Sequence, residues 1–109
     1  KQKNAAIFVA KTKEGMAGYL IFYYVLEEGE IARIATAHSV RRQGAASQMF
    51  RKLLDFCREQ KITRIMLEVR ENNEAARQFY GKCGFTKDGI RRNYYENPKE
   101  NAVLMSVNL

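Results

Sequence analysis

The amino-acid sequence predicts a mixed α/β fold in which helices cover the faces of a β-sheet. Two stretches, Gly44 to Gln60 and Asn73 to Gly84, space their apolar residues as amphipathic helices do. The segments around them alternate in polarity, or run continuously through β-branched and aromatic residues, as strands do. The resulting order of strands, helix, strand, helix and strands is typical of a mixed sheet with helices on its faces.

Six segments are predicted to be strands. They are Ala6 to Lys11, Ala17 to Leu26, Ile31 to Ala37, Ile62 to Val69, Phe85 to Ile90 and Ala102 to Val107. We expect Glu27 to Glu30 to form the turn of a hairpin, and Arg91 to Asn101 to be a polar loop. In the fourth strand, Ile65, Leu67 and Val69 would share one face because side chains alternate along a strand.

The two predicted helices carry signals for a buried face and for defined ends. The residues expected on the buried faces are Ala46, Met49, Phe50, Leu53, Leu54 and Cys57 in the first helix, and Ala76, Phe79, Tyr80 and Cys83 in the second. Asn72 or Asn73 would cap the second helix, because an Asn side chain accepts a hydrogen bond from a first-turn N–H group. Gly84 would end it in a left-handed conformation, with Phe85 packing back.

The composition is that of one globular domain over residues 1–109. Hydrophobic residues make up 46% of the chain and charged residues 28%, and there is one Pro. No apolar run approaches the roughly 20 residues that span a bilayer, and the polar start, Lys1 to Asn4, has no signal-peptide pattern. Cys57 and Cys83 have no paired spacing, so we expect two free thiols in a cytoplasmic protein.

The formal charge of +7 would attract polyanions. Nucleic acid, an anionic membrane surface and a phosphate-rich cofactor are all candidates on this ground, because charge alone does not choose among them. A solvated basic surface is the simplest explanation for most of these side chains.

A short basic segment with one glycine joins the third strand to the first helix. It comprises Arg41, Arg42, Gln43, Gly44, Ala45 and Ala46. Gly44 permits a close approach of backbone to a ligand, the helix start offers unpaired N–H groups to an anion, and the arginines add forked donors. The segment therefore suits a pyrophosphate, although a plain strand-to-helix turn explains it equally well. It is neither a nucleotide-triphosphate loop nor a dinucleotide fingerprint, because it lacks their glycine and lysine pattern.

Several motifs resemble those of one enzyme superfamily. Arg41-x-x-Gly44-x-Ala46 resembles the acyl-CoA pyrophosphate signature of the GNAT acetyltransferases, and Leu67-Glu68-Val69-Arg70 with the residues up to Gly84-Phe85 resembles their second motif. Arg91-Arg92-Asn93-Tyr94-Tyr95 resembles a string of the bacterial ribosomal-protein-alanine N-acetyltransferase subfamily. The resemblance covers nearly the whole chain.

The resemblance implies a splayed mixed sheet, with acetyl-CoA in a wedge between the strand that ends near Ala37 and the strand that ends near Val69. It implies that Glu68 is the general base and Tyr80 the general acid. The residues implied in cofactor binding are Ile34, Ala35, Thr36, Arg41, Arg42, Gln43, Gly44, Ala45, Ala46 and Asn73. The acceptor would be a protein N-terminal amine, and the N-terminal alanine of a small-subunit ribosomal protein is the acceptor of that subfamily.

Elementary chemistry agrees with these implied roles. An N-terminal ammonium has a pKa of about 7.7–8.0, so a carboxylate acting directly or through water suffices as its base. The leaving thiolate has a pKa near that of a thiol, about 8.5, and tyrosine titrates near 10. A Tyr hydroxyl can therefore assist the departing sulfur by a hydrogen bond.

Each of these residues also has a plainer explanation. Without the motif, Glu68 is a surface residue or salt-bridge partner, and Tyr80 is a core residue. His38 could be proposed as a base and Cys83 as an acyl carrier, but a loop histidine and a semi-buried thiol explain them better. No cluster of His, Cys and carboxylates has metal-ligand spacing, so we predict no metal.

Two other classes of function compete with the enzyme. The first is a degenerate GNAT fold that binds acyl-CoA or a protein without catalysis. The second is an RNA-binding module, although the sequence lacks the aromatic strand signatures of common RNA-binding domains. We expect neither direct nucleic-acid binding nor membrane binding.

The chain departs from the family pattern at several positions. Ala37 to Val40 replaces a usual Pro and aromatic residue, Ala46 stands where Gly is commoner, and Asn101 stands where an acid often precedes the last strand. Family members also begin with a strand and a helix pair, so we expect this chain to be N-terminally incomplete. Ala6 to Lys11 would then be an exposed edge strand, through which the protein could self-associate.

Overall fold

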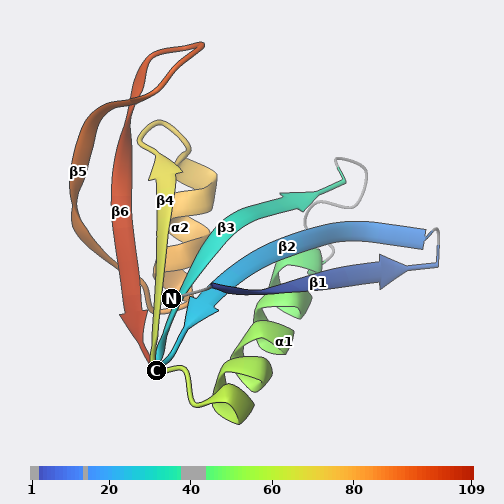
Figure 1. The fold of residues 1–109 in the computed structure, drawn as a ribbon. Helices are drawn as coiled ribbons and strands as arrows, with labels where there is room; N and C mark the ends of the chain where they lie inside the picture. Colours follow the sequence, from blue (N-terminus) through green and yellow to red (C-terminus); the bar gives the residue numbers. More distant parts are fainter. Residues whose placement is uncertain (1–2, 14, 38–43) are drawn as a thin grey trace. The chain divides into compact units, whose positions relative to one another are not determined.

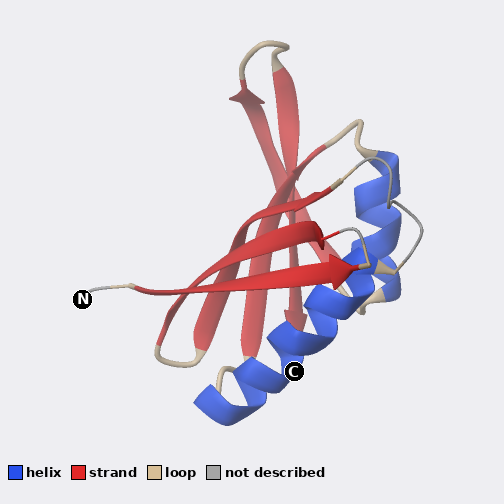
Figure 2. Cartoon of the chain, turned by 90° about the vertical axis from the view of Figure 1, so that its right-hand side faces the viewer, coloured by secondary structure: helices blue, strands red, loops and turns tan. Residues whose placement is uncertain are grey.

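The structure is a computed structural model that describes residues 3–13, 15–37 and 44–109. The described elements are β1 (Asn4–Thr12), β2 (Gly15–Val25), β3 (Glu28–Thr36), α1 (Ala45–Gln60), β4 (Arg64–Arg70), α2 (Glu74–Lys82), β5 (Thr86–Tyr95) and β6 (Glu100–Asn108). Figures 1 and 2 show this alternation of strands and helices, which confirms the predicted element order and the mixed α/β class. The chain divides into two compact units, Lys1–Thr63 and Arg64–Leu109.

The first unit contains an antiparallel meander of β1, β2 and β3. The predicted turn at Glu27 to Glu30 is wrong in position, because β3 already begins at Glu28 and the turn comprises Leu26 and Glu27. Leu26 adopts a left-handed φ of 54° there. Gly29 lies within β3. A Cβ at this position would collide with the ring of Phe22, which explains why the residue is a glycine. The glycine thus makes room for a core aromatic residue instead of forming the turn.

Helix α1 packs on the sheet of the first unit through the predicted apolar face (Figure 1). Its buried residues are Ala45, Met49, Phe50, Leu53 and Cys57. Ala46 and Leu54 are only half-buried, so Ala45 takes the place predicted for Ala46. Two side chains of α1 also bond the backbone of β1: Lys52 Nζ donates to Val9 O at 2.7 Å, and Lys11 N donates to Gln48 Oε1 at 3.3 Å. Two backbone polar groups of the edge strand β1 therefore have hydrogen-bond partners in α1. Self-association through β1 stays a prediction.

The second unit contains an antiparallel sheet in which β6 lies between β4 and β5. Ile65, Leu67 and Val69 of β4 are buried on one face, as predicted. The predicted loop from Arg91 to Asn101 is wrong, because β5 continues to Tyr95, a turn follows, and β6 begins at Glu100. Nearly all β5 side chains are exposed. A strand with two polar faces has no alternation of polarity, and its sequence therefore resembles a loop.

Helix α2 begins and ends at the predicted signals. Asn73 is the N-cap, and its Oδ1 accepts a hydrogen bond from Ala76 N at 3.1 Å. Gly84 follows the helix with a φ of 99°, and Phe85 N donates to Tyr80 O at 3.0 Å. Of the predicted apolar face only Tyr80 is fully buried within the helix. In the described part of the chain, no helix is long and apolar enough to cross a membrane.

Candidate active site

Glu68 lies in the middle of β4, opposite Leu104 of β6. Its side chain is only 20% exposed, so Glu68 is not an ordinary solvent-exposed surface residue. Oε2 is buried and has no hydrogen-bond partner among the described residues. The charged group nearest to it in an ion pair is the Arg91 guanidinium, whose Nη1 lies 3.5 Å from Oε2. A buried carboxylate oxygen without a hydrogen bond is costly for the fold, and such atoms are common at functional sites.

Tyr80 faces the sheet from α2 and is only 5% exposed. Its ring packs edge-on against Phe79 and Phe85, with centroid distances of 5.6 and 5.5 Å. Burial raises the pKa of Tyr80 to about 12, and the neighbouring Cys83 and Tyr95 add to the shift. The hydroxyl is therefore protonated over the whole physiological range and can serve as a hydrogen-bond donor.

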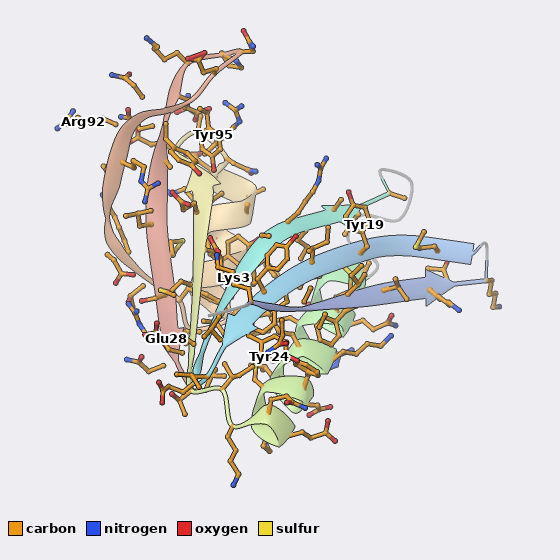
Figure 3. All side chains as sticks on the ribbon, viewed as in Figure 1. Lys3, Tyr19, Tyr24, Glu28, Arg92 and Tyr95 are labelled. Atoms are coloured by element: carbon orange, nitrogen blue, oxygen red, sulfur yellow. The ribbon has the colours of Figure 1, made fainter. Side chains whose placement is uncertain are left out.

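Tyr95 lies at the end of β5 and is not among the site residues predicted from the sequence. Burial raises its pKa, and the negative charge of Glu68 adds to the shift. Since Tyr95 in turn raises the pKa of Tyr80, it lies within electrostatic reach of both predicted catalytic residues. Figure 3 shows its ring on the side of the β5–β6 hairpin that faces the end of β4. The only signal in the sequence was the aromatic pair Tyr94-Tyr95 within a basic string.

The Arg70 guanidinium stacks over the ring of Tyr95, with its Cζ 4.3 Å from the ring centroid. In the same hairpin the Arg91 guanidinium lies over the ring of Tyr94 at 4.9 Å. Cation–π contacts of this kind stabilise the orientation of both partners. The second unit thus gathers Glu68, Tyr80 and Tyr95 in one neighbourhood, with arginines alongside.

Asn73, predicted to contact the cofactor, begins α2 in the same unit. Its Oδ1 is committed to the helix cap. The amide Nδ2 is the only side-chain donor of Asn73, so it can donate a hydrogen bond to an acceptor atom of a ligand while Oδ1 caps the helix.

The remaining predicted cofactor-binding residues belong to the first unit. Ile34, Ala35 and Thr36 are half-buried residues at the end of β3. Arg41, Arg42 and Gln43 lie outside the described residues, as does His38. The predicted wedge between the two strand ends involves both units and stays a prediction.

Gly44, Ala45 and Ala46 form the start of α1. Gly44 has a left-handed φ of 79° and no side chain with which to cap the helix, and the first turn holds no acidic residue. The N–H groups of such a turn have no partner inside the helix, and the helix dipole makes this end positive. The helix start therefore fits an anionic group such as the pyrophosphate of acetyl-CoA.

Neither cysteine has the environment of a nucleophile. Cys57 and Cys83 are free thiols, as predicted. Burial raises the pKa of Cys57 to about 11 and also raises that of Cys83, so both resist forming the reactive thiolate. Among residues 3–13, 15–37 and 44–109, no group of three or more His, Cys, Asp or Glu side chains could hold a metal ion.

Several known proteins are similar to this chain. A relative from Bacillus subtilis is 34% identical over 95% of this chain and 70% of its own length. The ribosomal protein bS18-alanine N-acetyltransferases of Haemophilus ducreyi and Haemophilus influenzae are 30% and 37% identical, over 89% and 84% of this chain and 69% and 64% of their own lengths. The chain is therefore shorter than these relatives.

Solved structures give the same answer. The crystal structure of the ribosomal-protein-S18-alanine N-acetyltransferase from Escherichia coli has a TM-score of 0.89 and 30% identity, and it matches 99% of this chain and 71% of that one. A Bacillus anthracis acetyltransferase in complex with acetyl coenzyme A has a TM-score of 0.87 and 26% identity, over 97% of this chain and 63% of that one. The family model for the acetyltransferase (GNAT) family matches residues 1–85. With this match over most of its length, the chain belongs to the GNAT family of acetyltransferases.

Proposed function

We propose that this protein transfers the acetyl group of acetyl-CoA to the N-terminal amine of a protein, and that the N-terminal alanine of ribosomal protein bS18 is its acceptor. Glu68 Oε2 carries this proposal, because it is a buried acceptor atom without a hydrogen bond among the described residues. An N-terminal ammonium, with a pKa of about 7.7–8.0, offers the N–H donors that this oxygen lacks. Such a reaction on a ribosomal protein would take place in the cytoplasm.

In the proposed reaction, Glu68 removes a proton from the acceptor ammonium. The amine nitrogen then forms a bond to the carbonyl carbon of the thioester, and the carbon–sulfur bond breaks with its electron pair leaving on sulfur. The nitrogen gives up its second proton to solvent as the carbon–sulfur bond breaks. The thiolate accepts a hydrogen bond from the Tyr80 hydroxyl and takes up one proton from solvent. The products are the N-acetylated protein and CoA, with one proton released overall through Glu68, so atoms and charges balance.

The raised pKa of Tyr80 refines its proposed role. A phenol with a pKa of about 12 is a weaker acid than a thiol, whose pKa is about 8.5. Complete proton transfer to the thiolate is therefore uphill in the absence of further stabilisation. The hydroxyl supports the reaction mainly as a fixed hydrogen-bond donor that stabilises charge on sulfur as the bond breaks.

Each unit offers a group that suits a part of acetyl-CoA. In the first unit, the N–H groups that follow Gly44 suit the pyrophosphate. In the second unit, the Nδ2 of Asn73 suits a carbonyl of the pantetheine arm. Arg41 and Arg42 would add positive charge, as proposed from the sequence.

The test is a transfer assay with acetyl-CoA and a synthetic peptide that carries the N-terminus of bS18, with mass spectrometry of the product. We expect a gain of one acetyl group at the α-amine, and none on a peptide whose α-amine is already blocked. A protein that binds acetyl-CoA in calorimetry but transfers nothing would overturn the proposed enzyme in favour of a binding module.

A further inference from the structure

A group of polar side chains ties the β5–β6 hairpin to the end of β4. We call this group the hairpin latch and define it as Arg70, Glu71, Glu100 and Asn101. Arg70 Nη1 lies 3.2 Å from Glu100 Oε1 and donates to Pro98 O at 3.1 Å, and Arg70 Nη2 donates to Glu96 O at 3.4 Å. One guanidinium thus holds both the first residue of β6 and the turn of the hairpin.

The other oxygen of Glu100 extends the latch toward α2. Glu100 Oε2 accepts a hydrogen bond from Asn72 N at 2.5 Å, in the loop between β4 and α2. The Glu100 side chain is 11% exposed and the Arg70 side chain 34%. Removing one member of such a mostly buried pair leaves the other charge without compensation, so the pair resists disruption.

Asn101 makes the third connection, to a bulge in β5. Its Nδ2 donates to Glu71 Oε1 at 3.2 Å, while its Oδ1 accepts from Asn93 N at 2.9 Å. Asn93 has a left-handed φ of 53°. The β5–β6 register shifts here: Arg91 is opposite Ala102, but Tyr95 is opposite Glu100, so β5 contains extra residues between them.

A bulge redirects the side chains that flank it. On one side of this bulge, Arg91 forms the ion pair with Glu68. On the other side, Tyr95 lies under the Arg70 guanidinium and within electrostatic reach of Glu68. Arg92 lies within the bulge and points away from the hairpin (Figure 3). The latch thus fixes residues 91–95 of β5, and the path of this stretch determines which side chains face Glu68.

We propose that the hairpin latch is a positioning device for the acceptor: Arg70 and Glu100 fix the hairpin turn, Asn101 fixes the β5 bulge, and together they shape the place beside Glu68 where the acceptor amine binds. This inference rests on the proposed function. The latch residues themselves do not touch the reacting atoms, so they are positioning residues. Their effect should fall more on the acceptor than on acetyl-CoA, because the proposed pyrophosphate site at the start of α1 belongs to the first unit. Of the proposed cofactor-binding residues, Asn73 alone is a chain neighbour of a residue that the latch bonds, Asn72.

The experiment compares Glu100→Gln and Arg70→Lys with the parent chain. A Gln at 100 keeps the size of the side chain but cannot accept from both Arg70 and Asn72 N, and a Lys at 70 keeps the charge but loses the fork. We expect the KM for an alanine-terminated peptide to rise about tenfold in each variant, while the dissociation constant of acetyl-CoA changes less than about twofold. Asp88→Asn removes an exposed carboxylate from β5, the partner strand of β6 in the same hairpin, outside the latch, and is the matched control.

Amide hydrogen exchange, measured by NMR, tests the latch in the absence of any acceptor peptide. The N–H groups of Asn72 and Asn93 should exchange faster in Glu100→Ala and in Asn101→Ala, respectively, because each then loses the side-chain oxygen that accepts its hydrogen bond. An inactive parent chain would overturn the proposed function. An active parent whose variants keep the acceptor KM within about twofold would overturn the latch alone. Equal losses of acceptor and acetyl-CoA binding, with a lowered Tm, would make the group merely structural and would also overturn it.

Discussion

Arg91 Nη1 lies 3.5 Å from Glu68 Oε2, so the proposed general base is paired with a cation of its own chain. The Arg91 side chain is 55% exposed, and its guanidinium also contacts the ring of Tyr94. An acceptor ammonium that reaches Oε2 must share this oxygen with Arg91 or displace it. The ion pair therefore competes with the proposed substrate.

Arg91→Gln should consequently lower the KM for the acceptor peptide. Exposed ion pairs contribute about 0.2–1 kcal/mol, which corresponds to a change of up to about fivefold. The measurement is a peptide saturation curve at saturating acetyl-CoA. Arg92→Gln removes the same charge at a side chain that points away from the hairpin, and it should leave the KM unchanged. A higher KM in Arg91→Gln would mean that the arginine helps to bind the peptide.

Glu68→Gln should lower kcat by about 10²–10⁴, because a positioned acid or base typically contributes this much. The affinity for acetyl-CoA should be retained, since the substitution removes only a proton acceptor. Rapid-quench assays and calorimetry measure the two quantities. Glu74→Gln, at an exposed position on α2, is the control. If Glu68→Gln keeps more than about a third of the parental rate, Glu68 is a structural partner of Arg91.

The start of α1 offers a test of cofactor binding with a matched control. Gly44 and Gly15 both have positive φ, at 79° and 110°, and a Cβ at either position would meet no atom within 4 Å. An Ala at either position is strained by about 1–2 kcal/mol. We expect Gly44→Ala to weaken acetyl-CoA binding in a calorimetric titration, and Gly44→Val to weaken it further. Gly15→Ala should destabilise the fold alone, and equal affinities in both Ala variants would contradict the proposed pyrophosphate site.

Tyr80 should make the stability of the fold depend on pH at alkaline values. Its pKa is raised from 10.0 to about 12 in the folded protein, so the unfolded chain loses this proton first as pH rises. The stabilisation is complete below about pH 10 and is lost as pH rises to about 12, by at most about 3 kcal/mol. Urea unfolding between pH 9 and 12 measures it. Tyr80→Phe should flatten this decline, whereas Tyr23→Phe at an exposed position should not.

The elements that the sequence predicted well are those whose burial differs between two faces. Helix α1 and β4 each bury one face, so the spacing of Met49 and Leu53, and of Ile65 and Leu67, identified them. The first half of β5 was predicted as a strand, but its second half, Arg91 to Tyr95, is exposed on both faces, and its polarity pattern therefore favoured a loop. Short-range chemistry was equally informative at Asn73 and Gly84, where a cap and a left-handed turn need particular residues.

The part of the site that the sequence missed depends on contacts between distant residues. Tyr95 comes close to Glu68 because a bulge, held by Asn101, shifts the register of β5 against β6. No local pattern predicts a register shift that a side chain on another strand stabilises. Asn101 stood out only as a departure from the family pattern, whereas the structure makes it the residue that bonds both Glu71 and Asn93.

The oxygen and the nitrogen of the Asn73 side-chain amide have different roles. A substitution that changes only the nitrogen can therefore alter ligand affinity without lowering the stability of the fold. The oxygen caps α2, while the nitrogen is the side chain's only donor. An aspartate would keep the capping oxygen and add a negative charge at the positive end of the helix, which favours the fold. Asn73→Asp should therefore raise or preserve the melting temperature and weaken acetyl-CoA binding at once. A protein of this family can thus lose its cosubstrate while becoming a better-folded domain.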